Sequence, residues 1–236
     1  MAIFDIFTKK RESGGRSIHH TTTGQMNVPK EAFPAAGTAG WDAIVAEFER
    51  IYPGQRHPKF FKAPLRWING GKDPFDGILV YDGGDYWHFV GLGLSELYGK
   101  VTSNPQVSGW GVEYTFKLKK GQYEDEEAEL KNVCEILQSR ARDTMNIGEV
   151  YQPYQYVYTG QTSGIDFAQS SNLTGFISVP DASVNGINTP NGEVQFIEFV
   201  GVTTTELSTM SSPEKVQEVY ALLGTDITDY GREAVV

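Results

Sequence analysis

A stretch near the middle of the chain alternates strictly between apolar and polar side chains. In Val112-Glu-Tyr-Thr-Phe-Lys-Leu-Lys119 the even positions are apolar and the odd positions are polar or charged. Successive side chains of a strand point to opposite faces of a sheet, so this period of two predicts a strand with one apolar face. A strand with one face open to water is typical of an antiparallel sheet. We therefore expect the polar residues, Glu113 and Lys117 among them, to face solvent.

Three other segments carry apolar residues at the spacing of one helix face. The first begins near Thr38 and stops at Pro53-Gly54. The second follows the acidic run 124–129, whose charge favours a helix N-terminus, and it places Cys134 on the apolar stripe. The third begins at Ser212-Pro213 and stops at Gly224.

Further strands are predicted on both sides of the second helix. Residues 78–81 and 86–90 are separated by Asp82-Gly-Gly-Asp85, which predicts a hairpin. Residues 176–179 form a short apolar run, and residues 194–202 are apolar on both faces, which indicates a central, buried strand. The resulting order predicts an α+β fold with a mostly antiparallel or mixed central sheet flanked by helices.

Composition is that of a folded chain: 39% of its 236 residues are hydrophobic and 12% are aromatic. Residues 1–37 are rich in polar, Gly and Pro breakers and predict a flexible leader, whereas residues 38–236 predict one domain. Within the leader, Ile3 to Arg11 is typical of a short amphipathic helix that docks on a membrane or partner; a loosely held chain end is the interpretation we favour. A secretory signal is absent, so we expect a cytoplasmic protein without membrane attachment.

The formal net charge is −10. This acidity argues against a nucleic-acid partner, because neutralising phosphates requires a basic face. It suits a basic protein partner through complementary charge, and solubility alone explains it equally well. Cys134 is the single cysteine, which excludes an internal disulfide and the zinc motifs built from several cysteines. The oligomeric state stays open.

Chemistry-bearing motifs are absent from the sequence. It contains no HExxH pair, phosphate-binding loop, dinucleotide fingerprint or G-x-S-x-G turn. We therefore predict no enzymatic activity, cofactor or metal. The alternative is an enzyme that uses His88 as a base with Asp73, Asp76 or Glu113. It requires His88 in an open polar pocket; a hydrogen-bonded structural histidine is the interpretation we favour.

The carboxylates that flank the predicted hairpin offer a second chemical possibility. Asp73, Asp76, Asp82 and Asp85 would suit Ca²⁺ or Mg²⁺ if the fold gathered them. Their neighbours are Gly and Pro, which are also ordinary turn formers, and we favour that interpretation.

Aromatic residues of the kind found at interfaces are unusually frequent. The alternation of Tyr154, Tyr156 and Tyr158 on an extended segment predicts a recognition groove, with packing on the sheet as the alternative. The predicted partner-binding residues, including two that rest on the resemblance described next, are Trp87, Phe89, Glu96, Tyr98, Trp110, Tyr154, Tyr156 and Tyr158.

Several segments together resemble the N-terminal domain of the suppressor of fused family. In chain order they cover about residues 38–233, and they are Gly40-Trp-Asp-Ala-Ile44, Tyr52-Pro-Gly54, Gly70-Gly-Lys-Asp-Pro74, Trp87-His-Phe89, Gly93-Leu-Ser-Glu-Leu-Tyr-Gly99, Ser108-Gly-Trp-Gly-Val-Glu-Tyr-Thr-Phe-Lys-Leu-Lys119, Thr189-Pro-Asn-Gly192, Gly201-Val-Thr-Thr-Thr-Glu-Leu207, Ile227-Thr-Asp229 and Arg232.

The resemblance implies a non-catalytic protein-binding module. In the animal members a second domain joins this one, and the two clamp a short peptide of Gli transcription factors as an added strand. The present chain is similar to the single-domain bacterial members, which are suspected to include immunity proteins that neutralise toxins. The resemblance places Phe89 and Glu96 near the animal peptide site, where family members commonly have Tyr and Asp.

Overall fold

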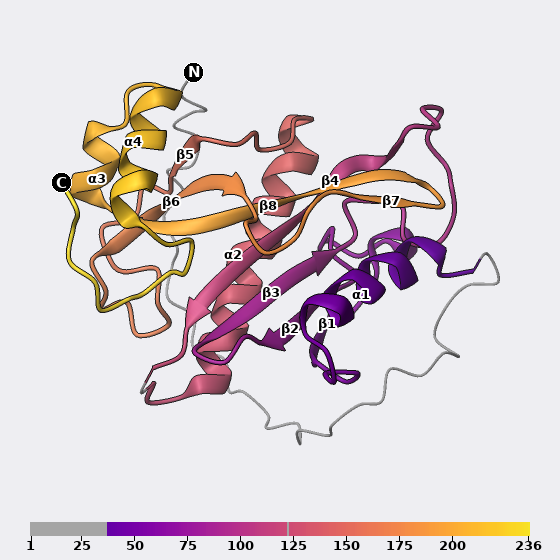
Figure 1. Cartoon of the computed structure of the whole chain (residues 1–236), viewed down its shortest axis with the longest axis horizontal. Helices are drawn as coiled ribbons and strands as arrows, with labels where there is room; N and C mark the ends of the chain where they lie inside the picture. Colours follow the sequence, from indigo (N-terminus) through magenta and orange to yellow (C-terminus); the bar gives the residue numbers. More distant parts are fainter. Residues whose placement is uncertain (1–36, 122) are drawn as a thin grey trace.

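The computed structural model describes residues 37–121 and 123–236, and within them an eight-stranded sheet forms the centre of the molecule (Figure 1). Its order is β1-β2-β3-β4-β8-β6-β5, with β7 paired to β8. The β4–β8 pairing is parallel, and the other pairings among the described strands are antiparallel. The strands are β1 (Lys59–Lys62), β2 (Gly77–Asp82), β3 (Tyr86–Leu92), β4 (Val107–Lys119), β5 (Gln155–Tyr158), β6 (Leu173–Pro180), β7 (Ile187–Thr189) and β8 (Gly192–Thr203).

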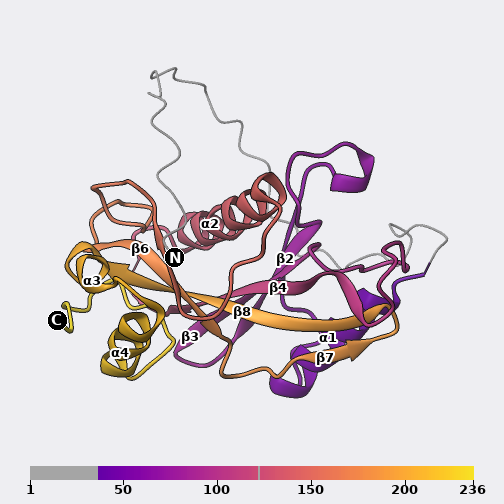
Figure 2. The same ribbon diagram turned by 90° about the horizontal axis from the view of Figure 1, so that it is seen from above.

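Helices cover both faces of this sheet (Figure 2). Helix α2 packs on one face, against the apolar side chains of β3, β4, β6 and β8. On the opposite face α1 packs near β2 and β3, while α4 packs over β6 and β8. The predicted α+β fold with a mixed sheet is confirmed. The helices are α1 (Ala39–Ile51), the 3-10 helix η2 (Trp67–Asn69), α2 (Glu126–Ile147), α3 (Thr204–Thr209) and α4 (Pro213–Leu223).

Capping residues at both ends determine where helices α2 and α4 begin and end. The Asp125 side chain accepts a hydrogen bond from the Ala128 N–H at the start of α2, and Gly148 ends that helix with a φ of 81°. Ser212 and Pro213 open α4 in the same manner, and Gly224 closes it. The three predicted helices and the predicted 82–85 hairpin are therefore confirmed.

The polar face of β4 contradicts the expectation of solvent exposure. Glu113, Thr115 and Lys117 are fully buried, and within the alternating stretch only Lys119 is exposed. Helices α1 and α4 cover this side of the sheet, so the polar side chains of β4 find partners inside the protein. The alternating sequence correctly indicates that one face of β4 is apolar and the other polar. It does not indicate which elements of the fold cover each face.

The segment predicted to be irregular, residues 146–192, contains more structure than its composition indicated. Besides the predicted strand, which extends to the full length of β6, it contributes β5 and β7. Strand β8 is central and almost wholly buried, as predicted. Residues 1–36 of the predicted leader, which include the Ile3 to Arg11 segment, lie outside the described residues. Within the described residues, none of the helices is long and apolar enough to cross a membrane.

Candidate functional site

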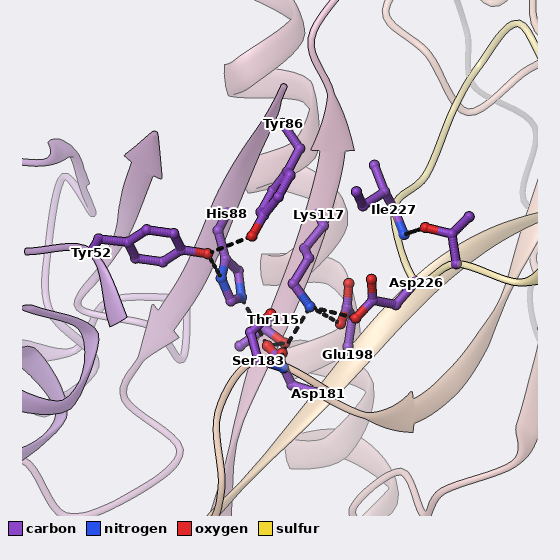
Figure 3. Close-up of polar contacts among 11 residues, drawn as sticks. Tyr52, Tyr86, His88, Thr115, Lys117, Asp181, Ser183, Glu198, Asp226 and Ile227 are labelled. Carbon is purple, nitrogen blue, oxygen red and sulfur yellow. Dashed lines mark hydrogen bonds and ion pairs between the residues drawn. The ribbon is translucent and has the colours of Figure 1, made fainter. Parts of the chain in front are cut away.

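Polar side chains from several strands meet on the sheet face that α1 and α4 cover (Figure 3). The strand register brings them together, because His88 lies opposite Lys117 and Thr115 lies opposite Glu198. Two chain segments outside the central strands add Asp181 and Asp226. We call this set the buried polar cluster; its members are Tyr52, His88, Thr115, Lys117, Asp181, Glu198 and Asp226.

Lys117 is the hub of the buried polar cluster. Its Nζ donates to Asp181 Oδ1 at 2.8 Å, to Glu198 Oε2 at 2.6 Å and to Asp226 Oδ2 at 2.7 Å. Burial alone would lower the pKa of Lys117, but the three carboxylates outweigh it and raise that pKa above its ordinary value.

The same three carboxylates lie close enough to one another to hold a metal ion. Oxygen donors of this kind suit a hard divalent cation. Lys117 contacts all three, however, so the chain supplies the cation that balances them. The arrangement therefore fits a buried ion network rather than a metal centre.

His88 is held at both ring nitrogens. Its Nε2 lies 2.8 Å from Asp181 Oδ2, and its Nδ1 lies 2.7 Å from the Tyr52 hydroxyl, which in turn lies 3.1 Å from the Tyr86 hydroxyl. Burial lowers the pKa of His88 against the opposing pull of Asp181. If the ring is neutral, donates from Nε2 to Asp181 and accepts at Nδ1 from Tyr52, every group in this row of hydrogen bonds has a partner.

Two carboxylates of the cluster, Asp181 and Glu198, have pKa values shifted in opposite directions. Burial would raise the pKa of Asp181, but His88 and Lys117 outweigh it and hold that pKa well below its ordinary value. Thr115 Oγ1 adds a further hydrogen bond to Asp181, at 2.7 Å. Burial and the neighbouring Asp181 charge instead raise the pKa of Glu198 well above its ordinary value, and its Oε1 has no hydrogen-bond partner among the described groups. The raised pKa favours the neutral form of Glu198 more than that of an ordinary glutamate.

This geometry does not support the enzyme alternative. His88 is fully buried with both nitrogens engaged, so a substrate has no access to it. Its carboxylate partner is Asp181 and not one of the three proposed residues. Asp73 pairs with Arg142, Asp76 accepts from Tyr98, and Glu113 accepts from the loop at residues 93–95.

The four aspartates proposed for Ca²⁺ or Mg²⁺ are also not gathered. Asp82 pairs with Lys120 and accepts from the Gly84 N–H in the hairpin turn, while Asp73 and Asp76 have the separate partners just described. The only carboxylate group with metal-binding spacing among the described residues is the one around Lys117. The turn-forming interpretation of these aspartates fits the structure better.

Two of the predicted partner-binding residues face inward. Phe89 is fully buried in the core beneath α2, and its role in partner binding stays a prediction. The Glu96 carboxylate accepts from the backbone N–H groups of Val101, Thr102 and Gly109 and pairs with Lys100 at 2.8 Å. Burial opposes these contacts, which nonetheless lower the pKa of Glu96 to about 2. Glu96 therefore organises its own loop.

The remaining predicted residues fall into separate regions of the surface. Trp87 packs beneath the ammonium groups of Lys59 and Lys120, which lie 5.0 Å and 4.1 Å from its ring centroid. Tyr98 donates to Asp76 Oδ2 at 2.5 Å and is half-buried. The structure does not bring Trp87 and Tyr98 together with the β5 tyrosines into one groove, and their role in partner binding stays a prediction.

The tyrosines of the 154–158 segment lie at the β5 end of the sheet order, and Trp110 lies on the central strand β4. Tyr154 and Tyr156 are half-buried and pack against the cluster beneath α4, whereas Tyr158 is 53% exposed. Trp110 lines an open cleft together with Gln155, the first residue of β5. These residues stay candidates for partner contact.

The sequence held one usable signal for the buried polar cluster. Glu198 lies within a strand that is apolar on both faces, and a charge buried there requires a partner. Asp181 and Asp226 carried no such signal, because they lie in connecting segments 64 and 109 positions from Lys117.

Comparison with known proteins identifies the fold and its family. Residues 71–233 match the family described as Suppressor of fused protein (SUFU). The human and mouse proteins named Suppressor of fused homolog are each 30% identical to this chain over 181 residues, which cover 71% of this chain and 36% of theirs. The chain thus spans about a third of the length of these curated relatives.

Solved structures share the same architecture. The crystal structure of Drosophila Suppressor of Fused matches with a TM-score of 0.71 and 25% identity, over 84% of this chain and 52% of that one. A structure titled the Sufu-Fu complex matches with a TM-score of 0.72 and 24% identity over 84% and 93% of the two chains. A homologue from Neisseria gonorrhoeae matches with a TM-score of 0.56 and 16% identity over 85% and 98%. The chain described here belongs to the suppressor of fused family.

Proposed function

We propose that this chain is a non-catalytic, cytoplasmic protein-binding domain that acts by sequestering a protein partner. The observation that carries this proposal is the family relationship, since a similar fold was solved in a structure titled the Sufu-Fu complex. The burial of His88 agrees with a non-catalytic function. It forms the one histidine–carboxylate pair among the described residues, and solvent does not reach that pair.

Charge indicates what kind of partner is involved. The chain has a formal net charge of −10, which steers a basic protein toward it and disfavours nucleic acid. We propose further that the partner is a basic toxin and that this chain is its immunity protein, as the resemblance to bacterial members suggests.

Affinity capture from the source organism tests the first proposal. The full chain is used as bait, and each captured protein is then produced alone and titrated against the bait by calorimetry. We expect a one-to-one complex whose affinity falls as salt rises from 50 to 500 mM, because opposite charges drive the encounter. If no captured protein binds the purified bait at micromolar concentration, protein binding by this chain is refuted.

Co-expression tests the immunity proposal separately. A toxin partner should arrest growth when produced alone and should lose that effect when this chain is produced with it. A partner that binds but harms no cell would leave the protein-binding function standing and overturn the immunity role.

A further inference from the structure

An open cleft lies where α2 ends and the chain turns toward β5. Its volume is about 370 Å³, and it is lined by Trp110, Gly148, Glu149, Val150, Gln152 and Gln155. Helix α2 stops at Gly148 in a left-handed conformation, which redirects the chain away from the helix axis. The space that this turn leaves forms the cleft.

The wall opposite this turn is formed by an irregular part of β4. The pairing of β4 with β8 shifts register between Val107 and Val112, and the two glycines that flank Trp110 have φ values of 56° and 74°. Such irregularities re-aim a side chain relative to a regular strand. Here Trp110 is half-buried, with part of its ring packed on the core and part lining the cleft.

The cleft pairs an aromatic ring with an unpaired negative charge. Glu149 is exposed, and its carboxylate has no ion-pair or hydrogen-bond partner among the described residues. A lysine or arginine side chain fits this combination, because its apolar stem packs on an indole, its cation is attracted to the ring face, and a carboxylate neutralises its head.

The strand that starts at the cleft is an edge strand of the sheet within residues 37–121 and 123–236. Strand β5 is the last strand in the order, and its sequence Gln155-Tyr-Val-Tyr158 contains no charge. At the other edge, β1 has Lys59 and Lys62 at its two ends. Charged residues are a usual protection of sheet edges against pairing, so the contrast indicates that β5 is the edge open to an added strand.

We propose that the cleft and the outer edge of β5 together bind an extended, basic segment of the partner protein. The segment pairs with β5 as an added strand and places a lysine or arginine side chain between Trp110 and Glu149. Gln155 belongs to both features, so one continuous segment reaches both. This inference rests on the proposed protein-binding function and names the chemistry of the partner.

Charge decides between a foreign segment and a second copy of this chain. Two copies each have a net charge of −10 and repel one another, whereas a basic segment is attracted to the same surface. The β5 edge is therefore assigned to a basic partner segment.

A synthetic peptide of alternating valine and lysine, ten residues long and fluorescently labelled, is the first probe. Its binding to the full chain is followed by anisotropy, with a valine–glutamate peptide and a proline-interrupted valine–lysine peptide as controls. We expect binding of the uninterrupted basic peptide and at least about tenfold weaker binding of both controls, since they lack the cation or the strand. Equal binding of all three peptides would overturn the proposal.

Three variants locate the bound peptide. Glu149→Gln and Trp110→Phe should each raise the Kd of the basic peptide, by about three- to tenfold, because one removes the carboxylate and the other the stronger cation-binding ring. Tyr158→Lys should weaken binding by charging the edge of β5. The control is Trp67→Ala, an exposed aromatic on η2, which should leave the Kd unchanged.

The outcomes separate this inference from the proposed function. If a natural partner is captured and binds all three variants as it binds the unaltered chain, the cleft-and-edge site is wrong while protein binding stands. If Tyr158→Lys alone has no effect, pairing along β5 is refuted. A concentration-dependent dimer in sedimentation experiments that Tyr158→Lys abolishes would assign the edge to a second copy and overturn the proposal.

Discussion

Replacing Lys117 by methionine tests how strongly the buried polar cluster stabilises the fold. The side chain of Lys117 is 1% exposed, and its ammonium contacts three carboxylates at 2.6 to 2.8 Å. Methionine fills a similar volume but leaves Asp181 and Asp226 without their counter-charge. Removing one partner of a buried ion pair costs about 3–5 kcal/mol, because the remaining charge stays desolvated.

The surroundings of each carboxylate place the expected loss at the lower end of that range. The raised pKa of Glu198 favours its neutral form, so it contributes less uncompensated charge than Asp181 does. Asp181 keeps its contacts with His88 and Thr115, and the side chain of Asp226 is 16% exposed and gains water. We expect a loss of about 3 kcal/mol, which for a chain of this size corresponds to a fall in Tm of roughly 6–12 °C.

The pH dependence of this loss gives a second, independent readout. The raised pKa of Lys117 stabilises the protein fully below the ordinary value of 10.5, and this contribution disappears as the pH rises through the folded-state pKa. The lowered pKa of Asp181 stabilises the protein above its ordinary value of 3.8, and this contribution disappears as the pH falls through the folded-state pKa. The difference in stability between wild type and variant should therefore narrow at both pH extremes.

Urea denaturation followed by tryptophan fluorescence measures the loss, with Lys119→Met as the matched control. Lys119 lies on the same strand and face, but it is exposed and pairs with Asp229 at the surface, so we expect little change in the unfolding midpoint. The reasoning is refuted if Lys117→Met and Lys119→Met shift the midpoint equally, or if the loss in Lys117→Met does not change at the pH extremes.

Three further predictions follow from single residues. Glu198→Gln should flatten the pH dependence of stability. The pKa of Glu198 is raised above its ordinary value of 4.5 in the folded protein, so the wild type loses up to about 1.4 kcal/mol of stability per pH unit as the pH rises above 4.5. Urea titrations of both proteins at pH 5, 6.5 and 8 check this. Gln169→Gly should stabilise the fold by about 0.5–1 kcal/mol, because the exposed Gln169 has a φ of 57°, and an unchanged urea midpoint would contradict this. Cys134 is buried with a raised pKa, so Ellman's reagent should label it only after unfolding, and labelling of the native protein within minutes would show that the stripe on α2 is open.

Sequence patterns predicted those parts of the fold that depend on local chemistry. The apolar spacing and stop signals predicted α2 and α4, and the doubly apolar run predicted the central position of β8. The fate of the polar face of β4 could not be predicted this way, because its cover is built from α1 and α4, which are distant in the sequence. The same limit applies to Asp181 and Asp226, whose pairing with Lys117 exists only after the sheet has formed.

Phe89 shows the limit of transferring a site from a resemblance. Trp87 lies on the same face of β3 as Phe89 but is only half-buried. His88 is buried like Phe89 but points to the opposite face, because adjacent strand residues alternate between faces. A position near a binding site in a relative can thus be a core position here. Strand register, rather than the sequence motif, decides which residues of Trp87-His-Phe89 reach the surface.

The buried polar cluster also explains why the binding function is best sought at the sheet edges. It joins β3, β4 and β8 to the segment around Asp226, and Thr228 pairs in turn with the backbone of Lys117 and Lys119. These contacts hold the centre of the sheet and the end of the chain in one arrangement. They engage the polar side chains there with one another, although Glu198 Oε1 lacks a partner. Exposed side chains lie where the regular structure ends, as Glu149 does beyond α2 and Tyr158 does at the end of β5. A partner that binds without rearranging the core must therefore contact residues of that kind.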